Sequence, residues 1–158
     1  MERPHVDEIV IRAAEASDLE ALVRFNQGIA LETEGKQLDN DTLSRGVAAV
    51  LGDESLGFYT VATCNDQVVA CLMVTREWSD WRNGVFWWIQ SVYVDAAFRR
   101  QGIYRKLYQH VKLLASKHNV CGFRLYVEKD NTIAQQTYAD QGMHETVYRM
   151  FEQLSAKS

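Results

Sequence analysis

The sequence predicts an α/β (α+β) fold, in which a mixed central β-sheet carries helices on both faces. The 158 residues are 47% hydrophobic and 24% charged, as in a globular protein long enough to bury a core. Apolar residues recur at strand and at helical spacing in the order β-α-α-β-β-β-α-β-α-β. The one proline lies near the N-terminus, and no Gly/Ser-rich linker interrupts the chain. We therefore expect one domain over residues 1–158, with its core at about 8–152.

The first elements are expected to be a strand and two helices. The run Ile9-Val10-Ile11-Arg12 predicts a short strand. Ser17-Asp18-Leu19-Glu20 has the form of a capping box and opens the first helix. Asp39-Asn40-Asp41 supplies the cap of a second helix, whose apolar positions recur at helical spacing.

Two hairpins are expected in the middle of the chain. Apolar runs at 58–62 and 68–74 flank Asn65-Asp66, a favourable turn sequence. Asn83-Gly84 is a second turn sequence and leads into a strand at 85–94.

The second half alternates helices and strands. A long helix opens at Ile103, where apolar residues recur at helical spacing. A strand at 123–127, a helix at 131–141 and a last strand at 144–151 complete the predicted order.

A basic turn joins the strand at 85–94 to the long helix. Its sequence is Arg99-Arg100-Gln101-Gly102-Ile103-Tyr104. The first turn of a helix has unpaired N–H groups and the positive end of the dipole, so it suits a phosphate. Gly102 allows close approach of an anion, and the arginines add charged donors. On these residues alone, a solvated helix start fits equally well, and neither a P-loop nor a glycine-rich dinucleotide fingerprint is present.

A second motif downstream makes the pattern more specific. Asn131, Ala134 and Tyr138 follow a strand and share a helix, and Gly142-Met143 comes at the end of that helix. Together with the basic turn, this resembles the GNAT superfamily of acyl-CoA-dependent N-acyltransferases, whose motifs are Gln/Arg-x-x-Gly-x-Gly/Ala and Asn-x-x-Ala-x-x-x-Tyr, the second followed by Gly-Phe at the end of its helix. Two residues depart from the family pattern: Tyr104 stands where Gly or Ala is usual, and Met143 stands in place of Phe.

The resemblance implies transfer of an acetyl group from acetyl-CoA to a primary amine by direct attack, without an acyl-enzyme. Tyr138 would act as the general acid that protonates the departing thiolate, since a phenol with a pKa of about 10 is protonated at neutral pH. The ring of Tyr104 must then point away from the diphosphate. Residues implied in cofactor binding are Val92, Tyr93, Val94, Arg99, Arg100, Gln101, Gly102, Ile103, Tyr104, Arg105, Asn131 and Tyr138.

The acceptor side and the general base are less defined. Gln90 stands where many relatives have a glutamate, and an amide cannot accept a proton at neutral pH. Glu32 and Glu34 fall where the first two helices would meet over the acceptor, which tilts the expectation toward a small cationic amine or an amino-terminal or lysine amine. They fit two solvated carboxylates equally well. Trp78 and Trp81 form either a wall for an ammonium or a dimer surface.

Composition and residue spacing argue against several other kinds of protein, including nucleic-acid-binding, membrane-spanning and metal-binding ones. The net charge of −4 argues against a nucleic-acid partner. No apolar stretch reaches the length of a membrane span and no signal peptide is recognisable, so a cytoplasmic protein is expected. The four histidines share no ligand spacing, so no metal is expected. Cys71 and Cys121 are expected to be small buried hydrophobes. A homodimer is plausible from the resemblance.

Two alternative functions stay open from the sequence. The first is a CoA-binding sensor or regulatory module that has lost turnover, which Gln90 motivates. The second is a transferase of succinyl or longer acyl chains, which predicts a preference for a bulkier thioester.

Overall fold

The computed structural model describes residues 8–156, so Pro4 and His5 lie outside the described residues. The chain forms two units, Met1–Tyr126 and Val127–Ser158. The single domain over 1–158 stays a prediction.

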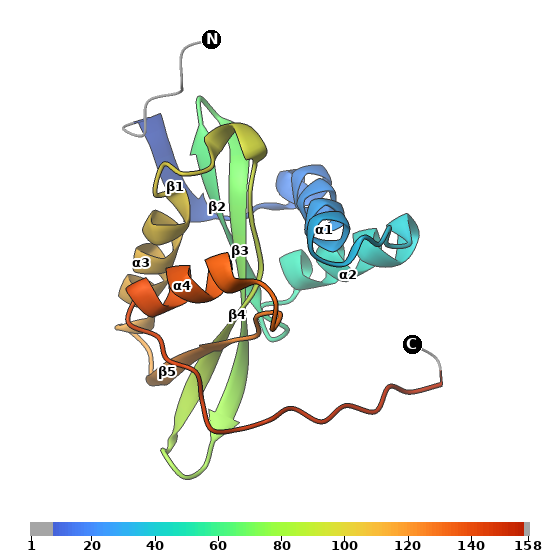
Figure 1. Ribbon diagram of the computed structural model, residues 1–158. Coiled ribbons are helices and arrows are strands. Elements are labelled where there is room, and N and C mark those ends of the chain that lie inside the picture. The colour runs from blue at the N-terminus through green and yellow to red at the C-terminus, as the bar shows by residue number, and fades with distance from the viewer. Residues whose placement is uncertain (1–7, 157–158) are drawn as a thin grey trace. The chain divides into compact units, whose positions relative to one another are not determined.

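The first unit is built on a five-stranded mixed sheet (Figure 1). Its strands lie in the order β1-β2-β3-β4-β5. Neighbouring strands are antiparallel except β4 and β5, which are parallel. A parallel neighbour needs a crossover connection, and helix α3 supplies it between β4 and β5. The predicted α+β class with a mixed sheet is confirmed. The strands span Ile9–Ala13 (β1), Phe58–Cys64 (β2), Gln67–Ser79 (β3), Gly84–Val94 (β4) and Val120–Leu125 (β5).

Helices cover both faces of this sheet. Helices α1 (Leu19–Glu34) and α2 (Asn40–Gly52) pack on one face, and α3 (Ile103–Ala115) packs on the other (Figure 1). Two short 3₁₀ turns, Ala16–Asp18 and Ala96–Phe98, precede α1 and follow β4. No helix among residues 8–156 is both long and apolar enough to cross a membrane.

Periodicity explains which side chains form the core. Along β2, Tyr59 and Val61 belong to the cluster under α1 and α2, so the alternation of a strand turns Thr60 and Ala62 to the α3 face. All four are buried. The cluster under α1 and α2 consists of Leu22, Val23, Phe25, Val47, Tyr59, Val61 and Cys71. The buried side chains of α3 are Ile103, Leu107, Tyr108, Val111 and Ala115.

One of the two predicted turns is confirmed, and the other is displaced. Asn65 and Asp66 have φ values of 49° and 65°, the left-handed pair that a two-residue hairpin requires. The second turn was wrongly placed at Asn83-Gly84. It is formed by residues 80–83 instead, and Gly84 is already paired with Ser79 in the ladder. The Asn83 N–H donates to the Asp80 carbonyl at 3.2 Å, which closes this longer turn.

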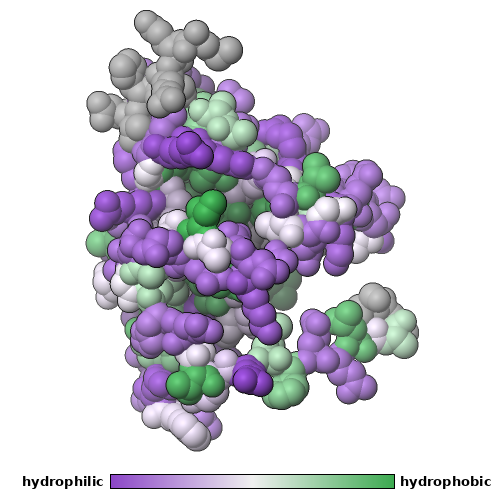
Figure 2. All heavy atoms as spheres, in the orientation of Figure 1, coloured by the Kyte–Doolittle hydropathy of each residue, from purple (hydrophilic) through white to green (hydrophobic). Residues whose placement is uncertain are grey.

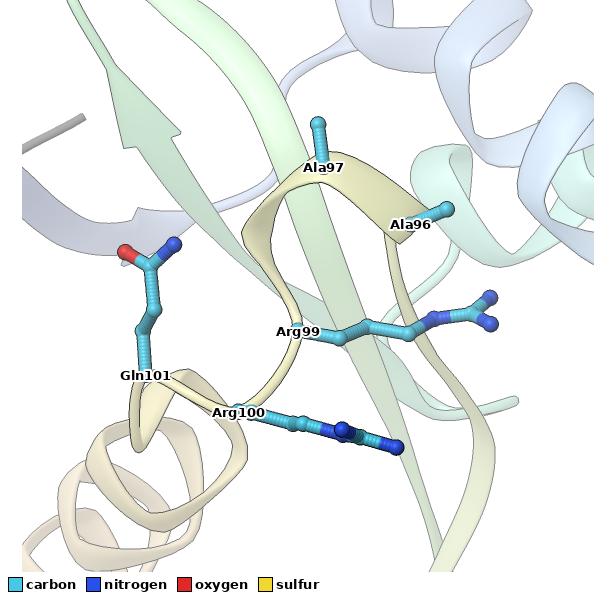
Figure 3. A pocket seen from close by; sticks show the side chains of 5 residues that line it. All are labelled: Ala96, Ala97, Arg99, Arg100 and Gln101. Atoms are coloured by element: carbon cyan, nitrogen blue, oxygen red, sulfur yellow. The ribbon is translucent and has the colours of Figure 1, made fainter. Parts of the chain in front are cut away.

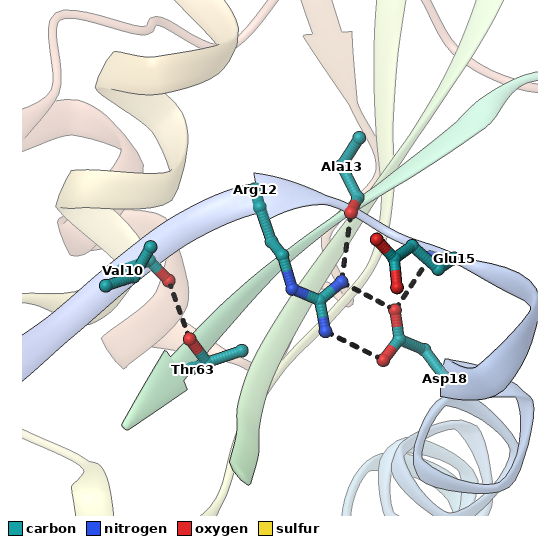
Figure 4. Close-up of polar contacts among 6 residues, drawn as sticks. All are labelled: Val10, Arg12, Ala13, Glu15, Asp18 and Thr63. Atoms are coloured by element: carbon teal, nitrogen blue, oxygen red, sulfur yellow. Dashed lines mark hydrogen bonds and ion pairs between the residues drawn. The ribbon is translucent and has the colours of Figure 1, made fainter. Parts of the chain in front are cut away.

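The expected capping box at Ser17-Asp18-Leu19-Glu20 is not what begins α1. The Asp18 carboxylate instead accepts two hydrogen bonds from the Arg12 guanidinium, at 2.8 and 3.0 Å, and a third from the Glu15 N–H at 2.7 Å (Figure 4). The Asp18 side chain is only 5% exposed. These contacts tie β1 to the start of α1, and the hydrogen bond from Arg12 holds the pKa of Asp18 below its usual value.

The second unit contains helix α4 (Thr132–Asp140) and the chain that follows it. The Asn131 side chain caps the helix by accepting from the Ala134 N–H at 3.1 Å. The predicted last strand at 144–151 is wrong, since these residues join no ladder in the part of the chain that the structure describes. A strand needs a neighbour for its backbone groups, and periodicity alone does not supply one.

Two other predictions need correction. The fifth strand begins and ends earlier than the predicted 123–127, because its pairing with β4 runs from Val120 to Leu125. Cys121, expected in the core, is exposed, because strand alternation turns it outward from this edge strand. Cys71 is buried as expected, and burial raises the pKa of its thiol to about 12.

Replacing Asp18 by Asn should destabilise the fold. We expect Asp18→Asn to lower the free energy of unfolding at pH 7 by about 2 kcal/mol, because Arg12 loses a charged partner that is largely buried. Urea denaturation measures this, with the exposed Asp41→Asn as the control that changes little. The folded pKa of Asp18 is depressed, so its contribution is complete above its ordinary value of 3.8 and is lost as the pH falls below it. A difference between the two proteins that does not shrink below about pH 4 would contradict this role.

Candidate active site

A bulge interrupts β4 near its end. Between the pairs Cys71↔Tyr93 and Met73↔Gln90, residues Ser91 and Val92 stand opposite Leu72 alone. Ser91 has a φ of 49°, the left-handed region that a bulged residue can occupy. Its carbonyl accepts from the buried Cys71 thiol at 3.2 Å, which fixes the bulge to the neighbouring strand.

The end of β4 that contains the bulge is no longer paired with β5. Pairing between the two strands ends at Ile89↔Leu125, so the backbone of residues 90–94 is not taken up by β5. The Asp95 N–H donates to Val69 in β3 at 2.8 Å. Because backbone groups alternate sides along a strand, those of Val94 face the edge that β5 has left. The bulge and this separation together present backbone groups on the edge of an otherwise paired sheet.

Asn26 and Tyr59 lie under the bulge, and the sequence did not indicate them. The Asn26 amide donates to the Tyr59 hydroxyl at 3.2 Å and to the Leu22 carbonyl at 2.9 Å. Burial raises the pKa of Tyr59, and the hydrogen bond from Asn26 opposes that rise. No local pattern marks these residues, because their contact joins α1 to β2 across 33 positions of sequence.

The chain then enters the basic loop. Arg100 and Gly102 have φ values of 64° and 76°, and α3 begins at Ile103. The first helical hydrogen bond here runs from the Lys106 N–H to the Gly102 carbonyl, so the amides before Lys106 have no partner within the helix. A Cβ placed on Gly102 would meet nothing within 4 Å, so the space beside this backbone is open. Left-handed residues beside a helix start form a concavity that binds anions.

A hollow of about 430 Å³ lies against this loop. The Arg99 and Arg100 side chains extend to the same side of the loop, while the Gln101 side chain points in another direction (Figure 3). Positive charge therefore gathers on one side of the hollow. Its lining residues are Ala96, Ala97, Arg99, Arg100 and Gln101.

Arg99 is held by three other residues. Its guanidinium bridges both carboxylate oxygens of Glu32, at 2.8 and 2.9 Å, and its Nε donates to the Val94 carbonyl at 2.8 Å. It also lies over the ring of Tyr93, 5.2 Å from the centroid. The hydrogen bond from Arg99 lowers the pKa of Glu32, which is therefore charged and paired. The structure thus brings four predicted site residues together, namely Glu32, Tyr93, Val94 and Arg99. The negative charge of Glu32, however, is neutralised by its ion pair with Arg99.

Tyr93 lies between Arg99 and helix α1. Its ring stacks on Phe25 with centroids 5.1 Å apart. Gly28 faces the same ring, and a Cβ on Gly28 would come within 2.8 Å of it. A glycine inside a helix is unfavourable unless something requires it, so this one was a signal that the sequence offered. Burial, followed by the charge of Glu32, raises the pKa of Tyr93.

The remaining residues of the loop differ in burial and in the direction of their side chains. The Ile103 side chain is buried in the core, so only its amide is directed to the loop. The Tyr104 ring stacks on Tyr108, one turn further along α3, with centroids 6.1 Å apart and an interplanar angle of 11°. That direction supports the expectation that this ring clears the first-turn amides. Arg100 and Arg105 are exposed.

The predicted acceptor residues do not gather. The Gln90 amide donates to the Thr75 hydroxyl at 2.6 Å, a partner that the sequence did not indicate. Glu34 is exposed and lies 3.8 Å from Lys36, outside the group around Arg99. Trp78 and Trp81 are 61% and 88% exposed near the tip of the hairpin between β3 and β4. Among the residues described, no group of three or more His, Cys, Asp or Glu side chains could hold a metal ion.

In the second unit, Asn131 and Tyr138 lie on α4. The Asn131 side chain is engaged in the helix cap. Tyr138 is half-buried, and burial raises the pKa of its phenol.

The comparisons with known proteins decide the family. A family model described as "Acetyltransferase (GNAT) family" matches residues 19–143. The chain belongs to this family. The match includes both motifs and most of the sheet, and it confirms the resemblance that the sequence indicated. Members of the GNAT family use acetyl-CoA as the donor.

Solved structures agree with this membership. The crystal structure of a possible acetyltransferase from Clostridium difficile 630 is 51% identical in sequence, covers 93% of this chain and 97% of its own, and superposes with a TM-score of 0.88. A predicted acetyltransferase from Clostridium acetobutylicum, solved with acetyl-CoA, is 19% identical. It covers 92% of this chain and 96% of its own with a TM-score of 0.76, and shows the shared fold. A comparison with curated proteins finds no match.

Adding a methyl group at Gly28 should have the opposite effect from adding one at Gly46. Both glycines lie inside helices, but a Cβ on Gly46 meets nothing within 4 Å. We expect Gly46→Ala to stabilise this GNAT-family chain by about 0.5–1 kcal/mol through helix propensity. Gly28→Ala should destabilise it by about 1 kcal/mol, because the Tyr93 ring must leave its place between Phe25 and Arg99. Urea denaturation of both variants checks the signs, and an equal gain for the two would contradict the contact.

Proposed function

We propose that this GNAT-family chain transfers the acetyl group of acetyl-CoA to a primary amine by direct attack. The observation that carries the proposal is the continuous course of the backbone from the bulge at Ser91 to the start of α3. It presents an open strand edge, followed by a positively charged loop that leads into the first turn of a helix, where amides point out of the helix end. An acyl-CoA has amide groups along its pantetheine arm and a diphosphate beyond them, which match these two features in order.

The binding residues divide between backbone and side chain. We assign the backbone of Val92 and Val94, on the side that β5 has left, to the pantetheine amides and the thioester. The backbone of Tyr93 between them faces β3, and the Val94 carbonyl accepts from Arg99, so the N–H is the group that Val94 offers. The amides from Gln101 to Arg105 take the diphosphate, with the free guanidinium of Arg100 as the charged contact. Arg99 supports the loop from behind, since its own charge is already paired with Glu32. Asn131 and Tyr138 come from the second motif, and the family resemblance alone supports their contact with the donor.

The chemistry needs a donor for the developing oxyanion and an acid for the thiolate. The neutral amine attacks the thioester carbonyl carbon, so that a C–N bond forms and the C–S bond breaks. A backbone N–H at the bulge stabilises the charge on the carbonyl oxygen, an effect that is commonly about 3 kcal/mol in the transition state. The Tyr138 phenol gives its proton to the departing sulfur, and the amine nitrogen gives up its own proton to water and regenerates the phenol through solvent.

The acceptor is assigned as a small cationic amine or an amino-terminal or lysine amine. The net charge of −4 favours a cation at the surface. Glu32 cannot supply that attraction while it is paired with Arg99, so Glu34 remains the candidate of the two. Gln90 can orient an amine or a water molecule, but it cannot remove a proton.

A thiol-release assay across amines tests this function. The purified chain is mixed with acetyl-CoA and polyamines, amino acids, aminoglycosides or peptides, and the released CoA thiol is followed. Release that depends on the amine, with an acetylated product of matching mass, supports the proposal. Tight binding of acetyl-CoA by calorimetry with no release would favour a CoA-binding sensor. A faster reaction with succinyl-CoA or a longer acyl-CoA would favour the alternative transferase.

Removing the hydroxyl of Tyr138 should slow the chemical step. We expect Tyr138→Phe to lower kcat by about 100-fold and to leave the KM for acetyl-CoA nearly unchanged, because general acid catalysis belongs to the transition state. Burial raises the pKa of this phenol, so the wild-type rate should not fall with loss of this proton until the pH exceeds about 10. Steady-state kinetics measure both effects. Tyr148→Phe, at an exposed position, is the control. Equal kcat values for the wild type and Tyr138→Phe would contradict the role of Tyr138 as the general acid.

Removing the charge of Arg100 should weaken donor binding. We expect Arg100→Ala to raise the Kd for CoA by about tenfold, or about 1.4 kcal/mol, through loss of a charged contact with the diphosphate. The difference in Kd between the wild type and Arg100→Ala should become smaller as salt is added, because salt screens the charged contact. Isothermal titration calorimetry measures the affinity, with the exposed Arg45→Ala on α2 as the matched control. An unchanged affinity for CoA would contradict the assignment.

A further inference from the structure

Ser91 has a backbone conformation that a serine seldom adopts. Its φ of 49° is left-handed, although it lies inside a strand, where an extended backbone is usual. Among the described residues, the other non-glycine residues with positive φ lie in turns or in the basic loop, namely Asn65, Asp66, Asn83 and Arg100. Such a conformation costs free energy and persists only where surrounding groups hold it. The groups that contact Ser91 therefore decide whether the bulge forms.

Two buried side chains reach Ser91 from neighbouring strands. The Cys71 thiol on β3 donates to the Ser91 carbonyl at 3.2 Å, and Cys71 is fully buried. Tyr59 on β2 is 5% exposed. Burial raises the pKa of Tyr59, and side-chain hydrogen bonds with Asn26 and Ser91 oppose that rise. The contact with Asn26, at 3.2 Å, also fixes the Tyr59 hydroxyl to helix α1.

The register of the sheet places these two side chains on either side of the bulge. Cys71 pairs with Tyr93, directly after the bulge. Tyr59 lies opposite Met73, which pairs with Gln90 directly before the bulge. Tyr59 and Cys71 both belong to the cluster under α1 and α2, so they lie on one face of the sheet. Two strands therefore support the bulged residue from that face.

Packing alone does not require a polar atom at Tyr59. Every other member of the cluster except Cys71 has a hydrocarbon side chain. Polar groups at the surface have water as a partner, as on the mostly hydrophilic face that Figure 2 shows, but a buried hydroxyl is unfavourable unless it is hydrogen-bonded. A phenylalanine would fill the same space without this cost. The hydroxyl is therefore explained by its contacts and not by the volume that it fills.

We propose that Tyr59 and Cys71 are positioning residues, which hold Ser91 in its left-handed conformation and thereby direct the N–H groups of Val92 and Val94 to the open edge of β4. Backbone groups alternate sides along a strand. If β4 lost the extra residue and slipped by one position against β3, the groups of Val92 and Val94 would turn to β3. This inference rests on the proposed acetyl transfer, in which a backbone N–H at the bulge stabilises the oxyanion.

Removing each supporting group should slow the chemical step. We expect Tyr59→Phe and Cys71→Ala each to lower kcat by about tenfold, because complete loss of an oxyanion donor costs about 100-fold or more and a displaced donor loses part of that effect. The KM for acetyl-CoA should stay within about twofold, since the basic loop is unchanged. Steady-state kinetics measure both quantities at a temperature where urea denaturation shows every variant to be folded.

Matched variants separate positioning from packing. Cys71→Ser keeps a donor beside the Ser91 carbonyl and should retain a kcat near that of the wild type, whereas Cys71→Ala should not. Tyr108→Phe removes the hydroxyl of another buried tyrosine, on α3, and should keep the wild-type kcat. A wild-type kcat in Tyr59→Phe or in Cys71→Ala would overturn the proposal. So would a Cys71→Ser protein as slow as Cys71→Ala.

A double-mutant cycle measures the support of Ser91 without any activity. Glycine adopts a left-handed backbone freely and has no hydroxyl to bond with Tyr59. By urea denaturation, Tyr59→Phe should therefore lower the free energy of unfolding less in a Ser91→Gly background than in the wild type. Equal losses in the two backgrounds would refute the contact. If the wild type releases no CoA with any amine, the proposed transfer fails, and this cycle still decides whether Tyr59 supports Ser91.

Discussion

The separation of β4 from β5 is the constraint on which the rest of the site depends. A parallel pair normally satisfies the backbone of both strands, but here the ladder stops at Ile89 and Leu125. The bulge at Ser91 turns the following residues at the place where the partner ends. Unpaired backbone in a sheet is costly unless something else pairs with it. The GNAT family binds acetyl-CoA, a ligand with amide groups of its own, and in the proposed function these amides pair with the edge.

The two neighbouring arginines of the basic loop differ in their contacts. Arg99 is held by Glu32, by the Val94 carbonyl and by the ring of Tyr93, so it connects β4, α1 and the loop. Arg100 has a left-handed backbone and an exposed side chain. In the proposed donor site, the loop held by Arg99 positions the helical amides for the diphosphate, and the exposed guanidinium of Arg100 adds positive charge beside them. Sequence alone treats the two arginines alike, because the difference lies in an ion pair across 67 positions.

Local chemistry accounts for most of what the sequence could predict. The period of apolar residues gave the helices and the mixed sheet, and Asn65-Asp66 has the left-handed pair that its type of turn needs. The errors share a different cause. The Asp18 carboxylate accepts from Arg12 and from the Glu15 N–H, so it caps the 3₁₀ turn before α1 and not α1 itself. Cys121 faces outward because β5 is an edge strand. The strand at 144–151 lacks a neighbour within the described chain. Each of these errors depends on which neighbour a residue or segment has in the folded chain, which local sequence does not determine.

The candidate site also depends on which groups contact one another in the folded chain. This explains which parts of the site the sequence reveals and which it does not. Backbone groups make up most of the proposed donor site, so side chains such as those of Val92 and Val94 reveal little of it in the sequence. Recognition of the acceptor must come from side chains, and here long-range contacts change the meaning of the residues. Glu32 is neutralised by Arg99, and Gln90 is tied to Thr75. For the proposed amine acceptor, a carboxylate that is not already paired within the chain is therefore the better candidate. Glu34, the last residue of α1, is exposed and makes only a long contact, 3.8 Å, with Lys36.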